Sequence, residues 1–575
     1  MCGIAGFFHS AGAALRPGEP EPLLQSMIGT LTHRGPDARG VFVGAGAALA
    51  HARLSIVDIE GGRQPMSTPD GDIWVSFNGE IFNYVELRRE LIERGHNLRT
   101  TSDTEVILYL YREMGPECVK AFNGDFAFAL WDAKRKLLML ARDRMGVRPL
   151  YYAHRGGCLY FASEVKGLLA VPGISAELDT VALDQIFTFW FPLASRTPFK
   201  NIFELPPAHM LIATPNGVQV QRYWQLQYPD ANDPAAWDKR SEGDISAELS
   251  ALLADATRIR LRADVPVGTY LSGGLDSSIV TATACQFARE RLRSFSVTFE
   301  SPEFDESRYQ QDMVQALGTE HSSIACGRAD IASSFPSVIR HVERPILRTA
   351  PTPLLHLAKL VRQSNFKVVL TGEGADEVFG GYDIFKEAKL RRFCERQPQS
   401  KHRPLLFQRL YPYLPQLRTQ PRKYVQAFFT TGLDRTADPL FSHLPRFRTT
   451  GGAKLVFSRD LKDALGDYNA LAELRDGLPA EFRRWHHLCQ AQYLETAYLL
   501  PGYILSSQGD RVSMAHAVEG RFPFLDHRVV EFAARIPPQL KIRGLREKHI
   551  LRESAKRLLP KEIVNRTKQP YRAPD

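Results

Sequence analysis

One heptapeptide limits the fold of this chain more than any other stretch: Ser272-Gly273-Gly274-Leu275-Asp276-Ser277-Ser278. The apolar residues 265–271 before it are typical of a buried strand, and the small apolar residues 278–284 after it are typical of a helix. Glycines at such a strand-to-helix turn let the backbone approach an anion, and the helix start offers unpaired N–H groups. We interpret the turn as a phosphate cradle, but not as a Walker loop, because no Gly-Lys-Ser/Thr follows. The alternative is an ordinary turn between two elements.

The length of 575 residues exceeds what one hydrophobic core supports, so we expect two or more domains. No apolar run is long enough to cross a bilayer, and the first residues lack the basic and apolar segments of a secretory signal. The seven cysteines are scattered, odd in number and without CxxC spacing, which argues for a reducing compartment and against structural zinc. We therefore expect a cytoplasmic protein with no membrane partner.

The positive charge is concentrated in one segment. Residues 386–448 contain fourteen Lys and Arg against four Asp and Glu, a net +10, whereas the whole chain carries +9. Such a cluster can bind nucleic acid. The favoured interpretation is instead a helical insertion with Arg and Lys outward and aromatic rings packed inward. A third interpretation is a docking surface for an acidic partner.

The first part of the chain, residues 2–225, has many short strand-like runs separated by turns. Helical patterns interrupt it at 82–93 and 103–113. This mixture predicts an α+β sandwich. A polar, proline-containing stretch at 226–243 then reads as a linker.

The second part, residues 244–575, alternates helical patterns with isolated apolar strands at 267–271, 295–299 and 367–370. Alternation of this kind predicts a doubly wound parallel α/β sheet. In such a sheet we expect ligand sites at the carboxyl ends of the strands.

The first candidate site begins at Cys2. If Met1 is removed, Cys2 carries a free α-amine beside its thiol. Because that amine titrates near neutrality, it can take the thiol proton, so one residue supplies both nucleophile and base. The alternative for this cysteine alone is a buried position in an edge strand.

Polar residues further along fit an amino-acid ligand. The Arg53 guanidinium suits an α-carboxylate, and the Asp103 carboxylate suits an α-ammonium. The Asn78 side chain and the Gly79 N–H are candidates for an oxyanion hole. Together with Cys2 they predict a site for the cleavage of an amide.

A second acidic stretch follows the predicted strand at 367–370: Thr371-Gly372-Glu373-Gly374-Ala375-Asp376-Glu377. Alone it is compatible with a solvated loop. Because it ends a strand opposite the phosphate cradle, its acids are better placed for metal binding and proton transfer. Mg²⁺ prefers carboxylate and phosphate oxygens, and Asp276 and Asp376 offer the carboxylates.

Several stretches together resemble the class II glutamine amidotransferase domain; they are residues 33–37, 53–58, 77–83, 101–105 and 142–151. With the Ser-Gly-Gly heptapeptide, they make the chain similar over nearly its whole length to the glutamine-hydrolysing asparagine synthetase family. The stretches 509–511, 519–526 and 546–552 match the synthetase half of that family. The resemblance implies an α+β N-terminal-nucleophile sandwich (αββα) followed by an α/β doubly wound adenylating domain with helical insertions.

The resemblance also implies what the first site does. Cys2 attacks the side-chain amide of glutamine and releases ammonia through a thioester. The residues implied for glutamine and the oxyanion are Arg53, Leu54, Ser55, Ile56, Val57, Asn78, Gly79, Glu80 and Asp103.

In the second half, the resemblance implies that ATP is split between its α and β phosphates and that Glu373 takes a proton as ammonia attacks the acyl-adenylate. The match at 546–552 puts the Lys548 cation where phosphate charge develops. Arg348 is a candidate for a second clamp on pyrophosphate, and we assign His549 to packing. The residues implied for ATP are Leu271, Ser272, Gly273, Gly274, Asp276, Ser277, Ser278, Val297, Thr371 and Gly372.

The acceptor is less defined by the sequence. Where residues 568–575 stand, one branch of the family has a glycine-rich segment, so the local sequence does not identify the acceptor carboxylate. Aspartate is expected because it is the family's commonest substrate. We expect the partners to be small-molecule substrates, an enclosed passage to carry ammonia between domains, and a homodimer as one assembly to be tested.

Three rival functions stay open. The first amidates another carboxylate, such as a specialised metabolite or a peptide. The second is a glutaminase domain that feeds a sugar-phosphate or iron–sulfur partner domain; the heptapeptide and the absence of clustered cysteines count against it. The third is a non-catalytic, basic interaction protein, against which the joint presence of the candidate catalytic residues counts.

Overall fold

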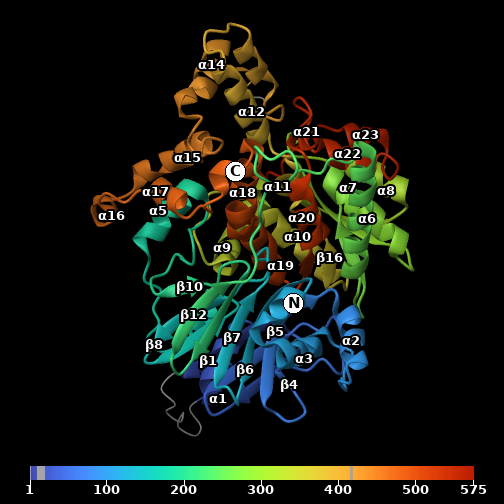
Figure 1. Cartoon of the computed structure of the whole chain (residues 1–575), viewed down its shortest axis with the longest axis vertical. Helices are drawn as coiled ribbons and strands as arrows, with labels where there is room; N and C mark the ends of the chain where they lie inside the picture. The colour runs from blue at the N-terminus through green and yellow to red at the C-terminus, as the bar shows by residue number, and fades with distance from the viewer. Residues whose placement is uncertain (1, 10–19, 415–416, 418, 575) are drawn as a thin grey trace.

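Two antiparallel sheets lie face to face in the first part of the chain (Figure 1). The computed structural model describes residues 2–9, 20–414, 417 and 419–574, and within these residues each of the two sheets has six strands. In sheet order, the first contains β10 (Ile202–Glu204), β8 (Tyr151–Arg155), β9 (Cys158–Ala162), β1 (Gly3–His9), β3 (Ala47–Arg53) and β2 (Ala38–Val43). The second contains β12 (Gly217–Arg222), β11 (His209–Thr214), β7 (Leu137–Arg142), β6 (Gly124–Asp132), β5 (Ile73–Ile81) and β4 (Met66–Ser67).

Side chains that alternate along each strand hold the layers together. In β1, Ile4 belongs to the core between the two sheets, whereas Phe7 packs against helices on the outer face. In β6, Trp131 lies in the same inner core, and Phe128 lies on the outer face of the second sheet. Because successive side chains of a strand point to opposite faces, each sheet buries both of its faces.

Helices cover the two outer faces. The first sheet is covered by α1 (Pro20–Gly29) and α4 (Val165–Leu169), and the second by α2 (Tyr84–Glu93) and α3 (Asp103–Met114). The layer order is therefore αββα. This confirms the predicted α+β sandwich.

A parallel sheet organises the second part of the chain. Over the described residues it has five strands in the order β15 (Glu320–Cys326), β14 (Arg293–Phe299), β13 (Val267–Tyr270), β16 (Val368–Leu370) and β17 (Glu519–Arg521). All neighbouring pairs are parallel. After β13, the chain adds β14 and β15 on one side of the sheet and then β16 and β17 on the other side. The direction of the strand order therefore reverses between β13 and β16. Ligands bind beyond the carboxyl ends of the strands at such a point.

Helices flank both faces of the parallel sheet. Val369 of β16 packs in a cluster with α10, whereas its neighbour Leu370 belongs to the cluster that contains α6 and α7. The predicted doubly wound fold is confirmed. The flanking helices are α6 (Glu242–Arg260), α7 (Leu275–Phe287), α8 (Ser307–Leu317), α9 (Arg328–Val342), α10 (Pro351–Gln363), α11 (Ala375–Phe379), α19 (Arg511–Met514), α20 (His527–Arg535), α21 (Pro538–Lys541), α22 (His549–Ala555) and α23 (Lys561–Asn565).

The predicted helical insertion is also confirmed, and Figure 1 shows its helix α14 at the end of the molecule far from the antiparallel sheets. Lys401 and Arg448 are exposed there, and Phe429 and Phe441 are buried, as predicted. Lys386 and Arg391 are also buried, so the prediction that Arg and Lys lie outward is wrong for these two. The helices that lie in or overlap residues 386–448 are α12 (Asp383–Glu395), α14 (Arg422–Thr430) and α15 (Leu444–Gly451). After them the chain continues through α16 (Arg459–Leu465), α17 (Ala470–Asp476), α18 (His487–Leu494) and a π-helix, Glu495–Asp510.

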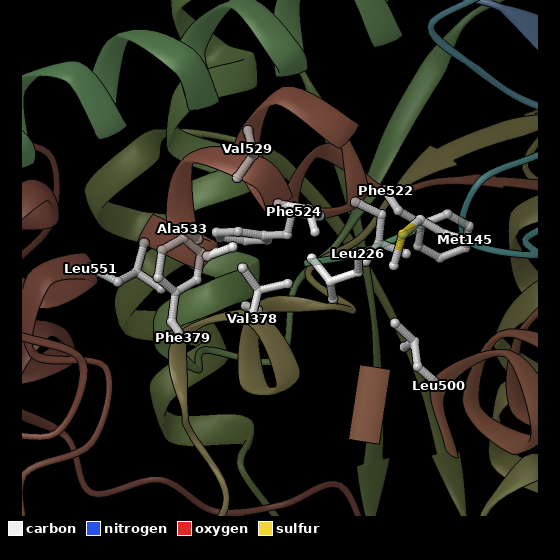
Figure 2. Packing of buried hydrophobic residues seen from close by; sticks show 14 of the residues in the cluster. Met145, Leu226, Val378, Phe379, Leu500, Phe522, Phe524, Val529, Ala533 and Leu551 are labelled. Atoms are coloured by element: carbon white, nitrogen blue, oxygen red, sulfur yellow. The ribbon is translucent and has the colours of Figure 1, made fainter. Parts of the chain in front are cut away.

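One buried cluster joins the two parts of the chain. Met145 from the first part and Leu226 from the start of the predicted linker lie in the same cluster as Leu500 and Phe522 from the second part (Figure 2). All four side chains are at most 5% exposed. Continuous apolar packing therefore fixes the relative position of the two parts, because separating them would expose these side chains to water.

Buried ion pairs add specificity to this interface. The Arg34 guanidinium donates to both carboxylate oxygens of Asp510, at 2.8 and 3.0 Å, and to Glu164 at 2.7 Å. The Arg260 Nη1 donates to Asp526 Oδ2 at 2.8 Å, and the Asn123 side chain donates to the same oxygen at 2.9 Å. Groups that are far apart in the sequence therefore satisfy one another out of contact with water.

Replacing Asp526 by alanine is expected to destabilise the protein by about 3–5 kcal/mol, because the buried Arg260 would lose its carboxylate. Although burial opposes ionisation, the Arg260 guanidinium holds the pKa of Asp526 well below its usual range. The contribution is therefore present above pH ~4 and declines as the pH falls below that value. Urea unfolding at pH 7 and pH 3 measures both effects. The exposed Asp463→Ala is the matched control, and an equal loss of stability in both variants would contradict the prediction.

Candidate active sites

A small pocket of about 30 Å³ lies beside Cys2 and has room for only a few water molecules. The predicted glutamine residues that line it are Arg53, Leu54, Ile56, Val57, Gly79, Glu80 and Asp103. Ser55 and Asn78, which we also predicted, are not part of the lining. The additional lining residues are Gly62, Gln64, Phe77, Ser102, Thr104 and Glu519.

The Cys2 thiol lies under the end of β3. Its sulfur accepts from the Leu54 backbone N–H at 3.4 Å, and the Cys2 nitrogen donates to Asn78 Oδ1 at 2.9 Å. Burial raises the pKa of the thiol. The thiol therefore needs a base, and removal of Met1 would convert the Cys2 nitrogen into an amine close to the sulfur.

Asn78 has an unused donor next to Cys2. Its Nδ2 is buried and has no hydrogen-bond partner among the described residues, while its Oδ1 is held by Cys2. The neighbouring Gly79 has φ of +148°, and a Cβ there would lie 2.1 Å from the Asp125 carbonyl oxygen. Only glycine fits this position, so β5 can pass close to β6 and keep Asn78 beside the thiol.

Changing Asn78 to aspartate should lower kcat for glutamine hydrolysis by roughly 10²- to 10³-fold, as removal of one oxyanion donor does elsewhere. Aspartate keeps the acceptor for the Cys2 nitrogen but has no N–H to donate. Amide formation from free ammonium should be unchanged. Steady-state kinetics with each nitrogen donor checks the prediction, with the exposed Asn216→Asp as control. Normal glutaminase activity in Asn78→Asp would exclude a donor role.

The charged residues of this pocket are held by the surrounding backbone. Arg53 donates to the carbonyl oxygens of Ile59 at 2.8 Å and Asp58 at 2.6 Å. Asp103 accepts from the Ile81 N–H at 3.0 Å, and burial raises its pKa to about 6. At neutral pH Asp103 is therefore ionised, which suits the α-ammonium group predicted to bind it.

Glu519 and Arg521 enter the same region from β17. Arg521 donates to Glu519 Oε1 at 2.6 Å and to Glu80 Oε2 at 3.2 Å. The sequence resemblance assigns residues 519–526 to the synthetase half, whereas the structure also places Glu519 in the lining of the Cys2 pocket. The contact follows from the strand order, because β17 is an edge strand of the parallel sheet and reaches the Cys2 pocket.

A second, larger cavity of about 850 Å³ opens at the carboxyl ends of β13 and β16. Thr269 pairs with Leu370, so the loops that follow the two strands start side by side. The predicted residues that line this cavity are Leu271, Ser272, Gly274, Asp276, Ser277, Val297, Arg348, Thr371, Gly372, Glu373, Asp376 and Lys548. Gly273 and Ser278 are not part of the lining.

The Ser-Gly-Gly turn has the shape expected of an anion cradle. Gly273 has φ of +70°, and a Cβ there would lie 2.5 Å from the carbonyl carbon of Tyr309. The Ser272 and Ser277 hydroxyls are 3.0 Å apart across the turn. Because α7 starts directly after Gly274, its free N–H groups face the same space.

Two aspartates and two lysines form a buried cluster in the cavity. Lys548 Nζ lies 2.6 Å from Asp276 Oδ2 and 2.6 Å from Asp376 Oδ1. Lys568, which we did not predict, lies 2.5 Å from Asp376 Oδ2 and 3.5 Å from Asp276 Oδ2. Although burial opposes the charged form, the two carboxylates raise the pKa of Lys568. Lys568 is therefore a cation beside the phosphate cradle.

Glu373 is an acid in the cavity whose charge changes near neutral pH. Burial raises its pKa to about 7, and the Thr371 hydroxyl donates to its Oε2. Among the described residues, it has no ion pair with Lys or Arg within 4 Å. A carboxylate with a pKa near the working pH is well suited to general base catalysis.

Comparison with known proteins finds a family match in each half of the chain. Residues 1–224 match the glutamine amidotransferase domain family, and residues 248–575 match the asparagine synthase family. The chain is 32% identical to the glutamine-hydrolyzing asparagine synthetase 1 of Bacillus subtilis, covering 100% of this chain and 87% of that protein.

The chain belongs to the glutamine-hydrolysing asparagine synthetase family. It is also 34% identical to asparagine synthetase 3 of Bacillus subtilis, over 99% of this chain and 87% of that protein. Amidase chyE of Penicillium rubens is 34% identical as well, over 100% of this chain and 89% of that protein.

As a member of the asparagine synthetase family, the protein is an ATP-dependent ligase that uses glutamine to make an amide. No helix in the described part of the chain has both the length and the apolar character needed to span a membrane. The family motif residues His549 and Arg148 have structural contacts: His549 pairs with Glu242 at 2.8 Å, and Arg148 donates to the Gly520 carbonyl at 3.1 Å.

Asp276 and Asp376 are suitable ligands for the Mg²⁺ expected in the asparagine synthetase family. The Asp276 Oδ1 is buried and has no hydrogen-bond partner among the described residues. Both carboxylates also converge on one point, since each is 2.6 Å from the same Lys548 nitrogen. Two converging carboxylates beside a phosphate cradle are the donor set that Mg²⁺ prefers.

Proposed function

We propose that the protein makes an amide from a carboxylic acid, ATP and glutamine, and releases glutamate, AMP and pyrophosphate. The observation behind this proposal is that Cys2 and Glu373 lie in two different cavities, each with the groups that its half-reaction needs. We assign residues 2–225 to glutamine hydrolysis, 226–243 to the linker and 244–575 to amide synthesis. An enclosed passage between them would carry ammonia.

At the first centre, the Cys2 thiol attacks the side-chain carbonyl carbon of glutamine after its proton passes to the Cys2 amine. The carbonyl oxygen becomes an oxyanion, for which the free Asn78 Nδ2 and the Gly79 N–H are the proposed donors. The C–N bond then breaks and ammonia leaves, with the proton returned by the amine. Water hydrolyses the thioester to glutamate and restores the thiol. Arg53 and Asp103 would hold the α-carboxylate and the α-ammonium group.

At the second centre, an oxygen of the acceptor carboxylate attacks the α-phosphorus of ATP. The bond from that phosphorus to the β-phosphate oxygen breaks, and pyrophosphate leaves toward the Ser-Gly-Gly turn, Arg348 and the two lysines. Ammonia then forms the C–N bond, AMP leaves, and Glu373 takes the proton released by nitrogen. Asp276 and Asp376 would hold Mg²⁺, which neutralises phosphate charge when bound.

Aspartate is the first acceptor to test, because two of the relatives are named asparagine synthetases. A larger carboxylic acid is the second candidate. It is favoured by the size of the cavity, which extends from the adenylation centre into the helical insertion. Relatives of similar identity that are named amidases are compatible with it.

Product analysis tests the reaction class. With glutamine, ATP and a panel of carboxylic acids, we expect glutamate, AMP and pyrophosphate in equal amounts with the amide. The formation of ADP and orthophosphate would contradict the proposed adenylation. Mass spectrometry of the purified protein shows whether Met1 has been removed, and glutamine hydrolysis by a protein that retains it would contradict the role of the Cys2 amine.

A further inference from the structure

The cavity that contains Glu373 continues into the insertion, where aromatic rings form its wall. Tyr411, Phe428 and Phe429 line it at this end, and we call these three residues the aromatic subsite. They come from the basic segment 386–448, for which the proposed reaction has no other role. The cavity is near the upper limit of the 300–1,000 Å³ typical of ligand pockets, so it has space for more than a nucleotide.

The aromatic subsite is an organised structure and not a loose cluster. The Tyr411 and Phe429 rings are nearly parallel, with an angle of 7° and a centroid distance of 6.1 Å. Phe428 meets Phe429 edge-on at 5.1 Å. Beneath them the buried Arg391 donates to the carbonyls of Phe429, Thr431 and Phe441 at 2.9–3.1 Å, which fixes the backbone that carries the rings.

A buried carboxyl group beside the subsite has one oxygen free. Glu387 is 4% exposed and lines the same cavity. Its Oε2 accepts from the Tyr411 hydroxyl at 2.5 Å, whereas its Oε1 has no hydrogen-bond partner among the described residues. Since a buried acceptor without a donor is costly, this oxygen is suited to an N–H group of a bound ligand.

Aspartate makes poor use of these features. It has a single methylene group between its charged ends, so it has no apolar surface to bury against three rings. Moving its charges next to the rings would also cost solvation energy. A ring in the ligand would gain both burial and favourable aromatic contacts.

We infer that the acceptor is an aromatic carboxylic acid that carries an amino group: its carboxylate lies at Glu373, its ring in the aromatic subsite and its amino group at Glu387. This inference rests on the proposed amide synthesis and specifies its substrate. Tyr411, Phe428, Phe429 and Glu387 are then the residues that determine specificity.

Pyrophosphate release with saturating ATP and ammonium tests the inference without glutamine. The probes are 3-(4-aminophenyl)propanoate and 4-aminobenzoate, their amino-free counterparts 3-phenylpropanoate and benzoate, and aspartate. We expect kcat/KM for at least one amino-bearing aromatic acid to exceed that for aspartate by at least tenfold. A preference for aspartate would overturn the inference and leave the proposed function intact. Pyrophosphate release with none of these five acids would also overturn the inference, whereas its absence with every acid of the wider panel would contradict the proposed function itself.

Two variants test the residues. Phe428→Ala should lower kcat/KM for the preferred aromatic acid by at least tenfold. Glu387→Gln should raise KM for the amino-bearing acid about tenfold, but not for its amino-free counterpart. Leu455→Ala, at an 85% exposed position, is the matched control and should behave as wild type. Glutamine hydrolysis, measured for each variant, reports on folding. Equal losses for both members of an acid pair in Glu387→Gln would refute recognition of the amino group.

Discussion

Replacing Cys2 by alanine is expected to lower glutamine-dependent amide formation by about 10⁴-fold or more, because the covalent route to ammonia is lost with the nucleophile. Amide formation from free ammonium should stay within about twofold of wild type. The reason is that Cys2 lines the small pocket near β3 and β5 and does not line the cavity that contains Glu373. Initial rates with glutamine and with ammonium chloride measure both quantities.

The buried Cys118→Ala is a suitable control for the loss of a thiol, since that residue is 0% exposed and lies in the core under α3. It tests folding without touching either site. Loss of ammonium-dependent synthesis in Cys2→Ala would show that the two centres are not chemically separate. Retention of glutamine use would show that another group is the nucleophile.

Replacing Glu373 by glutamine should lower ammonium-dependent amide formation by roughly 10²- to 10⁴-fold, the usual effect of a general base. Glutamine hydrolysis at Cys2 should continue. The rate of adenylation can be measured as the exchange of labelled pyrophosphate into ATP. This rate should fall less than the rate of amide formation, since Glu373 is proposed to act after the acyl-adenylate forms. Equal losses in both measurements would instead indicate a role in substrate binding.

The pKa of Glu373 gives this prediction a pH signature. Because burial raises that pKa to about 7, the carboxylate form that accepts a proton increases as the pH rises through 7. At constant free ammonia, the wild-type rate should therefore rise through pH 7 and level off, and Glu373→Gln should show no such step. A flat wild-type profile would exclude Glu373 as the base.

The same shift provides a folding control. A carboxyl group whose pKa is higher in the folded state than its unfolded value of about 4.3 costs stability above that value. Removing the charge should thus leave the thermal midpoint of Glu373→Gln at pH 8 equal to or above that of wild type. A lower midpoint would mean that lost packing, and not lost proton transfer, explains its inactivity.

Several elements could be predicted from the sequence because their signals are local. The strand, turn and helix around Ser272–Ser278 were expected from one apolar run, two glycines and a following run of small residues, and the structure has β13 and α7 there. The helices at 84–93 and 103–114 also follow their apolar periodicity. The expected fold class and family are also confirmed, because they were inferred from local patterns and motifs of this kind.

Other elements could not be predicted because their signals come from partners distant in the sequence. The strand β15, Glu320–Cys326, has four polar residues and only one buried residue, so it has no clear apolar pattern, and it forms because β14 offers an edge with which to pair. The strand β17 has three residues, of which two are charged. Their burial depends on the ion pairs with one another and with Glu80.

The sequence by itself determined the two chemistries, since a cysteine next to the initiator position and a serine–glycine turn before a helix are contiguous in the chain and act through their own backbone. Only the tertiary structure brought Lys568 to the two aspartates, Glu519 to the Cys2 pocket, and the rings of the insertion to the adenylation cavity. These placements depend on strand order and on packing between segments that are distant in the sequence. Residue patterns along the chain carry no record of such distances, so the shape of the acceptor site became visible only after folding.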